Sequence, residues 1–529
     1  MLRYAEPVET AADGNLRFRF SGGNSSTADR LAQWLPVAAC VGLLVFQMTR
    51  TNALFGLSEY DDGPYLGSAI RLVHGAVPYR DFAFPHPPGM PILLAPLAAL
   101  FRWSSTRTLM LGARLLTAGI AVVNVWLLAR LLRHRGSVVA GAAALGLAVF
   151  PLAPLATKTV LIEPYLVLLC LIGCTLLFHG DSLVGGRRLF WAGVVFGLAA
   201  TVKLWAAFPI LAVLACCLPN WRERLRRVVP GLVAGFAVPV LPFLVAAPRD
   251  FIRQVLVVQL QRAPAWGSLS VGQRFVFIAG LRPYSGVSSG VRIAVTLVIA
   301  LAVAALAAMW LRRPTSLDVF ALLSSVLVVI GMLVSGDMFM HYAYFSAVFL
   351  AVLGALTLGT FVRLADDSRL VSGCASGAAT FVALMGVLAM GVVGAVRTVS
   401  LLDREPGLIS IGDYGGRTSS KIPAGSCVLA DEPTVLLNAD RFVADRRCLA
   451  MVDPYYEWLV RSPKYPPPSA VPAPASLVEF WRRGMEQADY VVFGPNAFRV
   501  PWTPELSAWF NQHFVLVDTW YASVYRRLD

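Results

Sequence analysis

Asp61 and Asp62 are neighbouring carboxylates that follow the first strongly apolar segment of the chain. A carboxylate that can reach a hydroxyl group is able to act as a general base. A place at the boundary between water and lipid raises its basicity, because the charged form loses hydration. The ordinary explanation is that the pair caps a helix beginning near Pro64. We expect a functional role, because two carboxylates exceed what a cap requires.

Four further polar residues stand where apolar runs begin or end, and we expect them to contact a substrate: His86, Glu163, Lys203 and His341. Ionisable groups beside apolar sequence are rare and commonly functional. Each also has a structural explanation. Glu163 could cap a helix, and Lys203 could extend its ammonium to the membrane surface. The two histidines could end a loop or join a belt of interfacial aromatic side chains.

A phosphate group would need cationic partners, and the segment 248–290 supplies three arginines. Arg262, Arg274 and Arg282 could each be an ordinary solvated loop charge, but arginine is well suited to a phosphate leaving group. We expect one of them to reach phosphate, and the sequence does not distinguish between them. A metal site is not expected, because no His or Cys residues have ligand spacing. An acidic pair could hold a divalent cation, which is the less favoured reading.

These residues must be positioned by membrane helices. The chain has 529 residues, of which 57% are hydrophobic and only 14% are charged, about half the charge of a soluble protein. Long apolar runs recur from Leu31 to about Val396, which indicates a polytopic all-α membrane protein. About eleven spans are predicted, at 31–50, 108–130, 137–157, 160–179, 189–203, 204–218, 228–247, 291–311, 317–335, 342–360 and 371–396.

The arginine-rich loops decide the predicted topology, and the ambiguous run is Pro87–Phe101. If this short run does not cross, the arginine-rich loops all face the cytoplasm, as the positive-inside rule requires. The prediction is a plasma-membrane protein with a cytoplasmic tail at 1–30, a membrane domain at 31–396 and outer loops at 51–107 and 248–290. The same rule accounts for the net charge of +14 without nucleic acid.

Residues 397–529 are richer in turns, prolines and charges and are predicted to form a small extracytoplasmic α/β domain. "SCVLADEP", "ADYVVFGP" and "RFVADRRC" are typical of strands, and "FVLVDTWYASVYRRL" is typical of a closing hairpin. "SLVEFWRRGMEQ" and "PELSAWFNQHF" have amphipathic helical patterns. Cys427 and Cys448 are the two cysteines of this domain, and a disulfide between them is favoured slightly over free thiols.

The order of motifs "DDGPY", "GAVPYRDF" and "PHPPG" after the first span resembles the GT-C fold of membrane glycosyltransferases that use polyprenyl-phosphate sugars. Within that fold it is similar to the protein-mannosyltransferase and aminoarabinose-transferase branches and to actinobacterial arabinosyl- and mannosyltransferases. The resemblance covers about residues 31–396. It implies that Asp61 is the catalytic base and that Asp62, also in the catalytic site, positions the acceptor or tunes its neighbour. Tyr65 is expected to bind the substrate. A Glu-Lys pair common in one branch is replaced here by Pro85 and His86.

The resemblance implies an inverting glycosyltransferase that needs no cofactor. It would move a sugar from a polyprenyl-phosphate donor to a glycan, lipid or protein acceptor on the outer face of the membrane. Direct attack with one base predicts inversion. A double displacement is not indicated, because the sequence offers no second carboxylate at a fixed spacing. Two alternatives are a transporter or flippase of lipid-linked glycan and a non-catalytic envelope-assembly protein. Against a transporter, the sequence shows no clear internal repeat. The sugar and the acceptor stay open.

Overall fold

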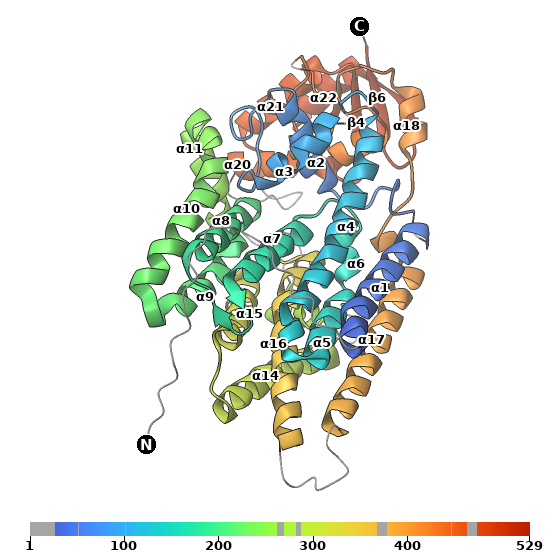
Figure 1. The fold of residues 1–529 in the computed structure, drawn as a ribbon. Helices are drawn as coiled ribbons and strands as arrows, with labels where there is room; N and C mark the ends of the chain where they lie inside the picture. Colours follow the sequence, from blue (N-terminus) through green and yellow to red (C-terminus); the bar gives the residue numbers. More distant parts are fainter. Residues whose placement is uncertain are drawn as a thin grey trace, which may run out of the picture.

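The computed structural model describes residues 27–528 except 51, 101, 262–268, 282–286, 368–377, 446 and 463–472. A long bundle of helices carries a small sheet domain at one end (Figure 1). The main bundle helices are α1 (Thr27–Arg50), α4 (Thr106–Leu132), α5 (Ser137–Ala148), α6 (Ala153–Thr157), α7 (Ile162–Leu177), α8 (Gly186–Val202), α9 (Ala207–Cys217), α10 (Trp221–Ala246), α14 (Val287–Leu311), α15 (Ser316–Val334), α16 (Ala343–Asp367) and α17 (Ala378–Arg404).

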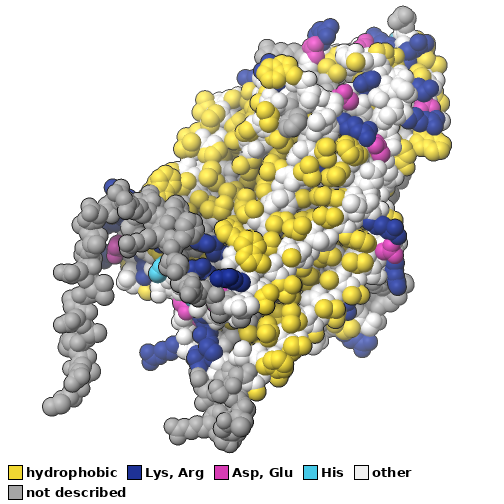
Figure 2. Space-filling model, turned by 45° about the vertical axis from the view of Figure 1, so that its right-hand side comes forward, with side chains coloured by type: hydrophobic (Ala, Val, Ile, Leu, Met, Phe, Trp, Pro, Cys, Tyr) yellow, Lys and Arg dark blue, Asp and Glu magenta, His cyan; other side chains and the backbone are white. Residues whose placement is uncertain are grey.

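Helix length and composition support a membrane domain. Among the described residues, seven helical stretches are long and apolar enough to cross a membrane, and α3 (Gly89–Leu100), α5 and α7 are shorter apolar helices. Figure 2 shows a broad area of apolar side chains between charged groups near the two ends of the molecule. Each predicted span overlaps one of the bundle helices. The fold class is therefore confirmed, whereas the count of eleven crossings stays a prediction.

Glycines let α8 and α10 pack at very close range. Gly193 and Gly197 on α8 face Gly231 and Gly235 on α10, so each helix carries two glycines four residues apart. A methyl group built on any of the four would overlap main-chain atoms of the opposite helix. Small residues at this spacing are the usual means by which membrane helices bring their backbones together. The pair holds the C-terminal end of α8, and therefore Lys203, in a fixed place.

The segment 51–107, predicted as the first outer loop, lies between the bundle and the sheet domain. It contains α2 (Asp62–Val73) and α3, which pack on each other beside that domain (Figure 1). Gly89 begins α3 directly against Thr201 near the end of α8, where a Cβ would approach the Thr201 carbonyl at 2.6 Å. Only glycine permits this approach, which brings the "PHPPG" turn beside Lys203.

The segment 248–281 supports the segment 51–107. It consists of α11 (Pro248–Ile252), the π-helical turn η4 (Arg253–Val257), α12 (Val258–Gln261) and α13 (Val271–Ile278). The Gln254 side chain accepts a bond from Phe84 N at 3.0 Å and donates to Tyr79 O at 3.2 Å. The Gln259 amide donates to Pro85 O at 2.8 Å. The main chain leading to His86 is thus fixed by this segment.

The sheet domain follows α17 and has the strand order β3-β4-β6-β5. β3 (Val428–Ala430) pairs parallel with β4 (Tyr490–Phe493), while β5 (Phe514–Thr519) and β6 (Ser523–Arg527) form an antiparallel hairpin. These strands confirm three of the predicted strand segments. The prediction of a strand in "RFVADRRC" was wrong, because the described residues of 441–448 form no strand. The domain's helices are α18 (Gly415–Lys421), α19 (Pro433–Asn438), α20 (Pro454–Arg461), α21 (Ala475–Gln487) and α22 (Pro504–His513).

The core of the sheet domain comes from its amphipathic helices. Leu477, Trp481 and Met485 recur at helical spacing on α21 and are fully buried, as the sequence pattern predicted. Cys427 immediately precedes β3, and a disulfide joins it to Cys448 with 5.4 Å between their Cα atoms. The bond ties the start of the sheet to the loop that leads into α20.

Candidate active site

Asp61 lies at the N-cap position of α2, half-buried, but its side chain makes no capping hydrogen bond. No hydrogen bond joins its carboxylate to any residue in the described part of the chain. Burial first, and then the negative charges of Glu59, Asp453 and Glu163, raise the pKa of Asp61 well above its usual value. Lys203 opposes them and lowers this pKa. The helix-cap explanation therefore does not hold for Asp61.

Asp62 has a different environment from its neighbour. It is completely buried and forms an ion pair with Arg114 on α4, with 2.5 Å between Nη2 and Oδ2. Its other oxygen accepts hydrogen bonds from the Thr159 hydroxyl and from Val160 N. Arg114 also donates to the carbonyl oxygens of Ala53, Leu54 and Gly56. The contacts of Asp62 therefore anchor the start of α2 to the bundle.

Glu163 and Lys203 meet in the same region, although 40 residues separate them. Lys203 Nζ lies 2.9 Å from Glu163 Oε1, and both side chains are buried. The ammonium also lies over the rings of Trp205 and Tyr342, at 4.0 and 3.6 Å from their centroids. Cation–π contacts of this kind stabilise a desolvated ammonium. The second oxygen of Glu163 is buried and has no hydrogen-bond partner among the described residues.

A cavity of about 370 Å³ lies beside this pair. Its polar lining includes His86, Lys203, Gln259 and Asp337. The rest is largely apolar, from Pro85, Pro87, Leu204, Trp205, Phe208, Leu211, Val255, Leu327, Ile330 and Val334. Leu211, Ile330 and Val334 are among the exposed apolar residues, so the apolar wall continues onto the outer surface of the helices. A cavity with a cationic end and an apolar wall suits an amphiphile with an anionic head.

Tyr65 and His86 lie next to each other, as their motifs suggested. Their rings stack with centroids 6.1 Å apart, and Phe84 contacts both rings edge-on. Tyr65 is buried on α2, whereas His86 lines the cavity. Burial, followed by the nearby charge of Asp61, raises the pKa of Tyr65 well above its usual value, so the phenol stays protonated. These contacts link α2, which follows Asp61, to the wall of the cavity.

The remaining residues predicted to contact a substrate have different environments. His341 is buried and stacks on Phe339 with centroids 5.7 Å apart. Arg274 is also buried, but its guanidinium donates to carbonyl oxygens at the C-terminal end of α15, including Met332 O at 2.9 Å and Ser335 O at 2.5 Å. Arg274 thus acts as a helix cap in the structure, and it does not line the cavity. Arg262 and Arg282 lie outside the described residues.

Sequence reasoning missed a contribution from the sheet domain. The Tyr60 hydroxyl donates to Asp453 Oδ1 at 2.8 Å, and the Arg499 guanidinium lies 4.2 Å from the centre of the Tyr60 ring. Thr434 accepts from Gly63 N and donates to Tyr60 O, at 2.9 and 2.8 Å. The sheet domain therefore holds the main chain on both sides of Asp61. Nothing in the spacing of these residues could have revealed this contact.

Glu59 and Lys158 form a second ion pair close to the base, with 2.5 Å between Nζ and Oε2. The Lys158 ammonium also donates to Leu408 O at 2.6 Å. The acids and bases around Asp61 thus come from the segment 51–107, from the ends of two bundle segments and from the sheet domain. Such a concentration of ionisable groups with a perturbed carboxylate is typical of an active site.

Solved structures share this architecture. The chain is similar to ArnT from Cupriavidus metallidurans bound to undecaprenyl phosphate, with a TM-score of 0.58, 16% identity and coverage of 94% of this chain and 98% of that chain. It is also similar to the Archaeoglobus fulgidus oligosaccharyltransferase in complex with Zn and sulfate, with a TM-score of 0.50, 14% identity and coverage of 88% and 68%. At these identities the likeness shows the fold.

The sequence itself decides the activity class. Residues 84–336 match the family model of glycosyltransferase family 87. The chain is a membrane glycosyltransferase with the GT-C fold. The matched region of this glycosyltransferase begins at Phe84, two residues before His86, and includes both Glu163 and Lys203. No curated protein sequence matches the chain. The alternatives of a transporter and of a non-catalytic assembly protein are therefore set aside.

Proposed function

We propose that this enzyme is an inverting glycosyltransferase that moves a sugar from a polyprenyl-phosphate donor to a hydroxyl group of a cell-envelope acceptor. The reaction takes place on the outer face of the plasma membrane, with Asp61 as general base. The observation that carries the proposal is the neighbourhood of Asp61. A carboxylate without a hydrogen bond to any described residue lies within electrostatic reach of Lys203, and Lys203 lines an amphiphilic cavity.

The cavity supports a lipid-linked donor. The apolar wall formed by Leu211, Ile330 and Val334 can accommodate a prenyl chain that enters from the membrane. At its polar end, Lys203 and His86 are the groups that would contact the phosphate. A structure of similar fold, ArnT from Cupriavidus metallidurans, holds undecaprenyl phosphate. A donor of the same class would place its sugar toward Asp61.

In this scheme the acceptor hydroxyl oxygen attacks the anomeric carbon of the sugar. The bond between that carbon and the phosphate oxygen breaks, and its electron pair leaves with the polyprenyl phosphate. The hydroxyl proton passes to Asp61, whose raised pKa makes it a stronger base than an exposed aspartate. Lys203 stabilises the negative charge that develops on the phosphate. A single displacement inverts the anomeric configuration.

Two other residues have positioning roles in this proposal. Asp62 and its Arg114 partner fix the start of α2, which sets the place of Asp61. Glu163 holds the Lys203 ammonium at the edge of the cavity. Breaking either ion pair would misplace a reacting group without removing it.

The test is the variant Asp61→Asn, compared with Asp81→Asn, which removes the same charge from an exposed position of the same outer segment. Transfer from labelled polyprenyl-phosphate mannose and arabinose should fall by about a hundredfold or more in the first variant only. Binding of undecaprenyl phosphate should persist in both, which shows that the fold is intact. Transfer at the wild-type rate by Asp61→Asn would rule out this base. Lipids extracted from cells lacking the enzyme should contain a truncated glycan that identifies the acceptor.

A further inference from the structure

A second cavity lies at the other end of the bundle, away from the sheet domain. It has a volume of about 180 Å³ and is lined by η1 (Arg133–Arg135), the turn at Asp181, the C-terminal ends of α14 and α16, and the start of α15. Four arginines and two aspartates line it, which leaves an excess of two positive charges. We infer that this cavity binds a phosphate group, and specifically the headgroup of an anionic phospholipid.

The geometry of Arg135 shows that the cavity is a built site. Its side chain is only 6% exposed and forms ion pairs with Asp181 at 2.5 Å and with Asp318 at 3.0 Å. It also donates to the Thr315 hydroxyl at 3.0 Å. Arginines that merely follow the positive-inside rule need no such support, because they extend into the solvated headgroup layer. This guanidinium is fixed in place before any ligand arrives.

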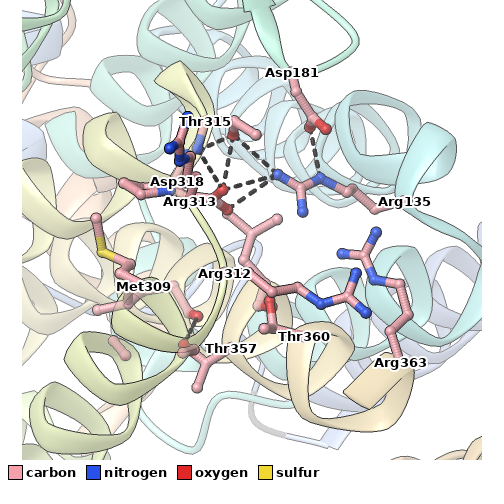
Figure 3. A pocket seen from close by; sticks show the side chains of 15 residues that line it. Arg135, Asp181, Met309, Arg312, Arg313, Thr315, Asp318, Thr357, Thr360 and Arg363 are labelled. Atoms are coloured by element: carbon pink, nitrogen blue, oxygen red, sulfur yellow. Dashed lines mark hydrogen bonds and ion pairs between the residues drawn. The ribbon is translucent and has the colours of Figure 1, made fainter. Parts of the chain in front are cut away.

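Two further guanidinium groups face the same space. Figure 3 shows the side chains of Arg312, from the loop after α14, and Arg363, from α16, extending toward one another on the side of the cavity where Arg135 lies. Like charges at this proximity repel, and the repulsion is strong where water is partly excluded. A phosphate between them would remove the repulsion and gain charge-assisted bonds, for which the planar guanidinium is well suited.

The apolar part of the cavity lining favours a lipid over free phosphate. Ala305, Ala308 and Met309 on α14 and Leu353 and Leu356 on α16 line the cavity together with the arginines. A headgroup could therefore bind the cations while its glycerol and acyl carbons contact these apolar side chains. Under the predicted topology this end of the bundle is in the cytoplasmic leaflet, where anionic lipids attract basic groups. The inference itself does not depend on the transfer reaction.

The experiment uses the full-length enzyme in detergent, with phosphatidylglycerol, phosphatidylcholine or inorganic phosphate added separately. Native mass spectrometry counts retained lipid, and thermal unfolding reports binding. Wild-type enzyme should retain phosphatidylglycerol and be stabilised by it, whereas phosphatidylcholine should have no such effect. The double variant Arg312→Gln/Arg363→Gln should bind phosphatidylglycerol at least about tenfold more weakly. Arg222→Gln/Arg226→Gln removes two exposed charges from α10 and should bind like wild type.

The outcomes separate the sources of the phosphate. Inorganic phosphate could stabilise the wild type while phosphatidylglycerol does not, and Arg312→Gln/Arg363→Gln could abolish this stabilisation. That result would support an anion site but overturn the proposal that the ligand is a lipid. Equal retention by wild type and both double variants would overturn the site. Glycosyl transfer by Arg312→Gln/Arg363→Gln should match that of the wild type in both cases, because the cavity is remote from Asp61, and this activity confirms that the variant is folded.

Discussion

Glu163 and Lys203 form a buried ion pair at the edge of the cavity that His86 and Lys203 line, with 2.9 Å between Oε1 and Nζ. The pair joins the start of α7 to the end of α8, and it holds Lys203, one of the two residues proposed to contact the donor phosphate. Removing one partner of a buried pair leaves an uncompensated charge, which is costly. The pair therefore serves the fold and the proposed chemistry together, and mutation can separate these two roles.

The variant Lys203→Met should lower the free energy of unfolding by about 3 kcal/mol, because it leaves the Glu163 carboxylate buried without its cation. It should also weaken binding of undecaprenyl phosphate. The double variant Glu163→Gln/Lys203→Met should recover most of the stability but none of the lipid binding. Thermal unfolding and a binding titration on the same preparations measure the two effects. Recovery of both properties in the double variant would show that Lys203 has a structural role only.

The pH dependence of transfer should respond to Asp453. The negative charge of this residue helps to raise the pKa of Asp61, after burial and Glu59. Asp453→Asn keeps an oxygen to accept from Tyr60 but removes the charge. The pKa of Asp61 should then fall, so the base stays ionised at lower pH. The acidic limb of the rate profile should move to lower pH, while an exposed control, Glu479→Gln, leaves it in place. A shift toward higher pH would contradict the assignment of the base.

Close packing of α8 on α10 should not tolerate a larger side chain. Gly235→Leu would force a side chain into the main chain of α8 at Val194, and the cost should exceed about 2 kcal/mol. Gly386→Leu on α17 is the matched control, because nothing lies within 4 Å of the position its Cβ would occupy. Thermal unfolding in detergent compares the two. Similar melting temperatures would mean that the helices can separate without loss of stability.

Stability of the enzyme should depend on two buried acids in the sheet domain. Burial raises the pKa of Asp431 to about 6 and that of Glu432 to about 7. Because these folded-state pKa values exceed the ordinary ones of 3.8 and 4.5, the protonated forms of the two acids favour the folded state. Their contribution to the free energy of unfolding is fully present below about pH 4 and is lost as the pH rises through 6 to 7. One oxygen of Asp431 is buried without a hydrogen-bond partner in the structure, which agrees with a preference for the neutral form.

Glu432→Gln removes one of these ionisations and retains an oxygen that can accept from Asn496. The variant should be more stable than wild type at pH 8, by about 2 kcal/mol, and nearly equal to it at pH 4. Melting curves across this range measure the difference, with Glu479→Gln as the exposed control. A stability gap that stays constant with pH would show that Glu432 does not titrate as its burial implies.

Sequence patterns predicted the helices well, because apolar runs of sufficient length have few alternatives in a membrane. They also placed Glu163 and Lys203 each at the end of an apolar run, although only the fold shows that the two side chains pair. Arg274 shows what a residue pattern does not reveal. One of three arginines in the segment 248–290 was expected to reach phosphate, and this stays a prediction. In the structure the Arg274 guanidinium donates mainly to main-chain carbonyls at the end of α15, including Met332 O. Every residue has a main-chain carbonyl group, so a pattern of residue types does not reveal which carbonyls a side chain will contact.

The sheet domain was the least predictable part of the site. "RFVADRRC" has apolar residues at strand-like spacing, but Arg441 instead donates to main-chain oxygens of Ile422 and Ser419. These contacts with the preceding helix take the place of a strand pairing. Asp453 and Arg499 stand almost 400 residues or more after Tyr60 in the sequence, and no spacing rule connects them. Contacts between distant segments decide the environment of Asp61, whereas local sequence decides only its helix.

Two hydrogen bonds join Thr434 to Tyr60 O and to Gly63 N, and they impose an order on biosynthesis. A nascent chain that has inserted all of its membrane helices has not yet delivered Thr434 to the segment that carries Asp61. That segment can take its final position only after the ribosome has made the last quarter of the protein and this part has folded against it. Maturation of the enzyme is thus coupled to completion and folding of its own C-terminal portion, so an unfinished chain has no completed centre with which to consume donor lipid.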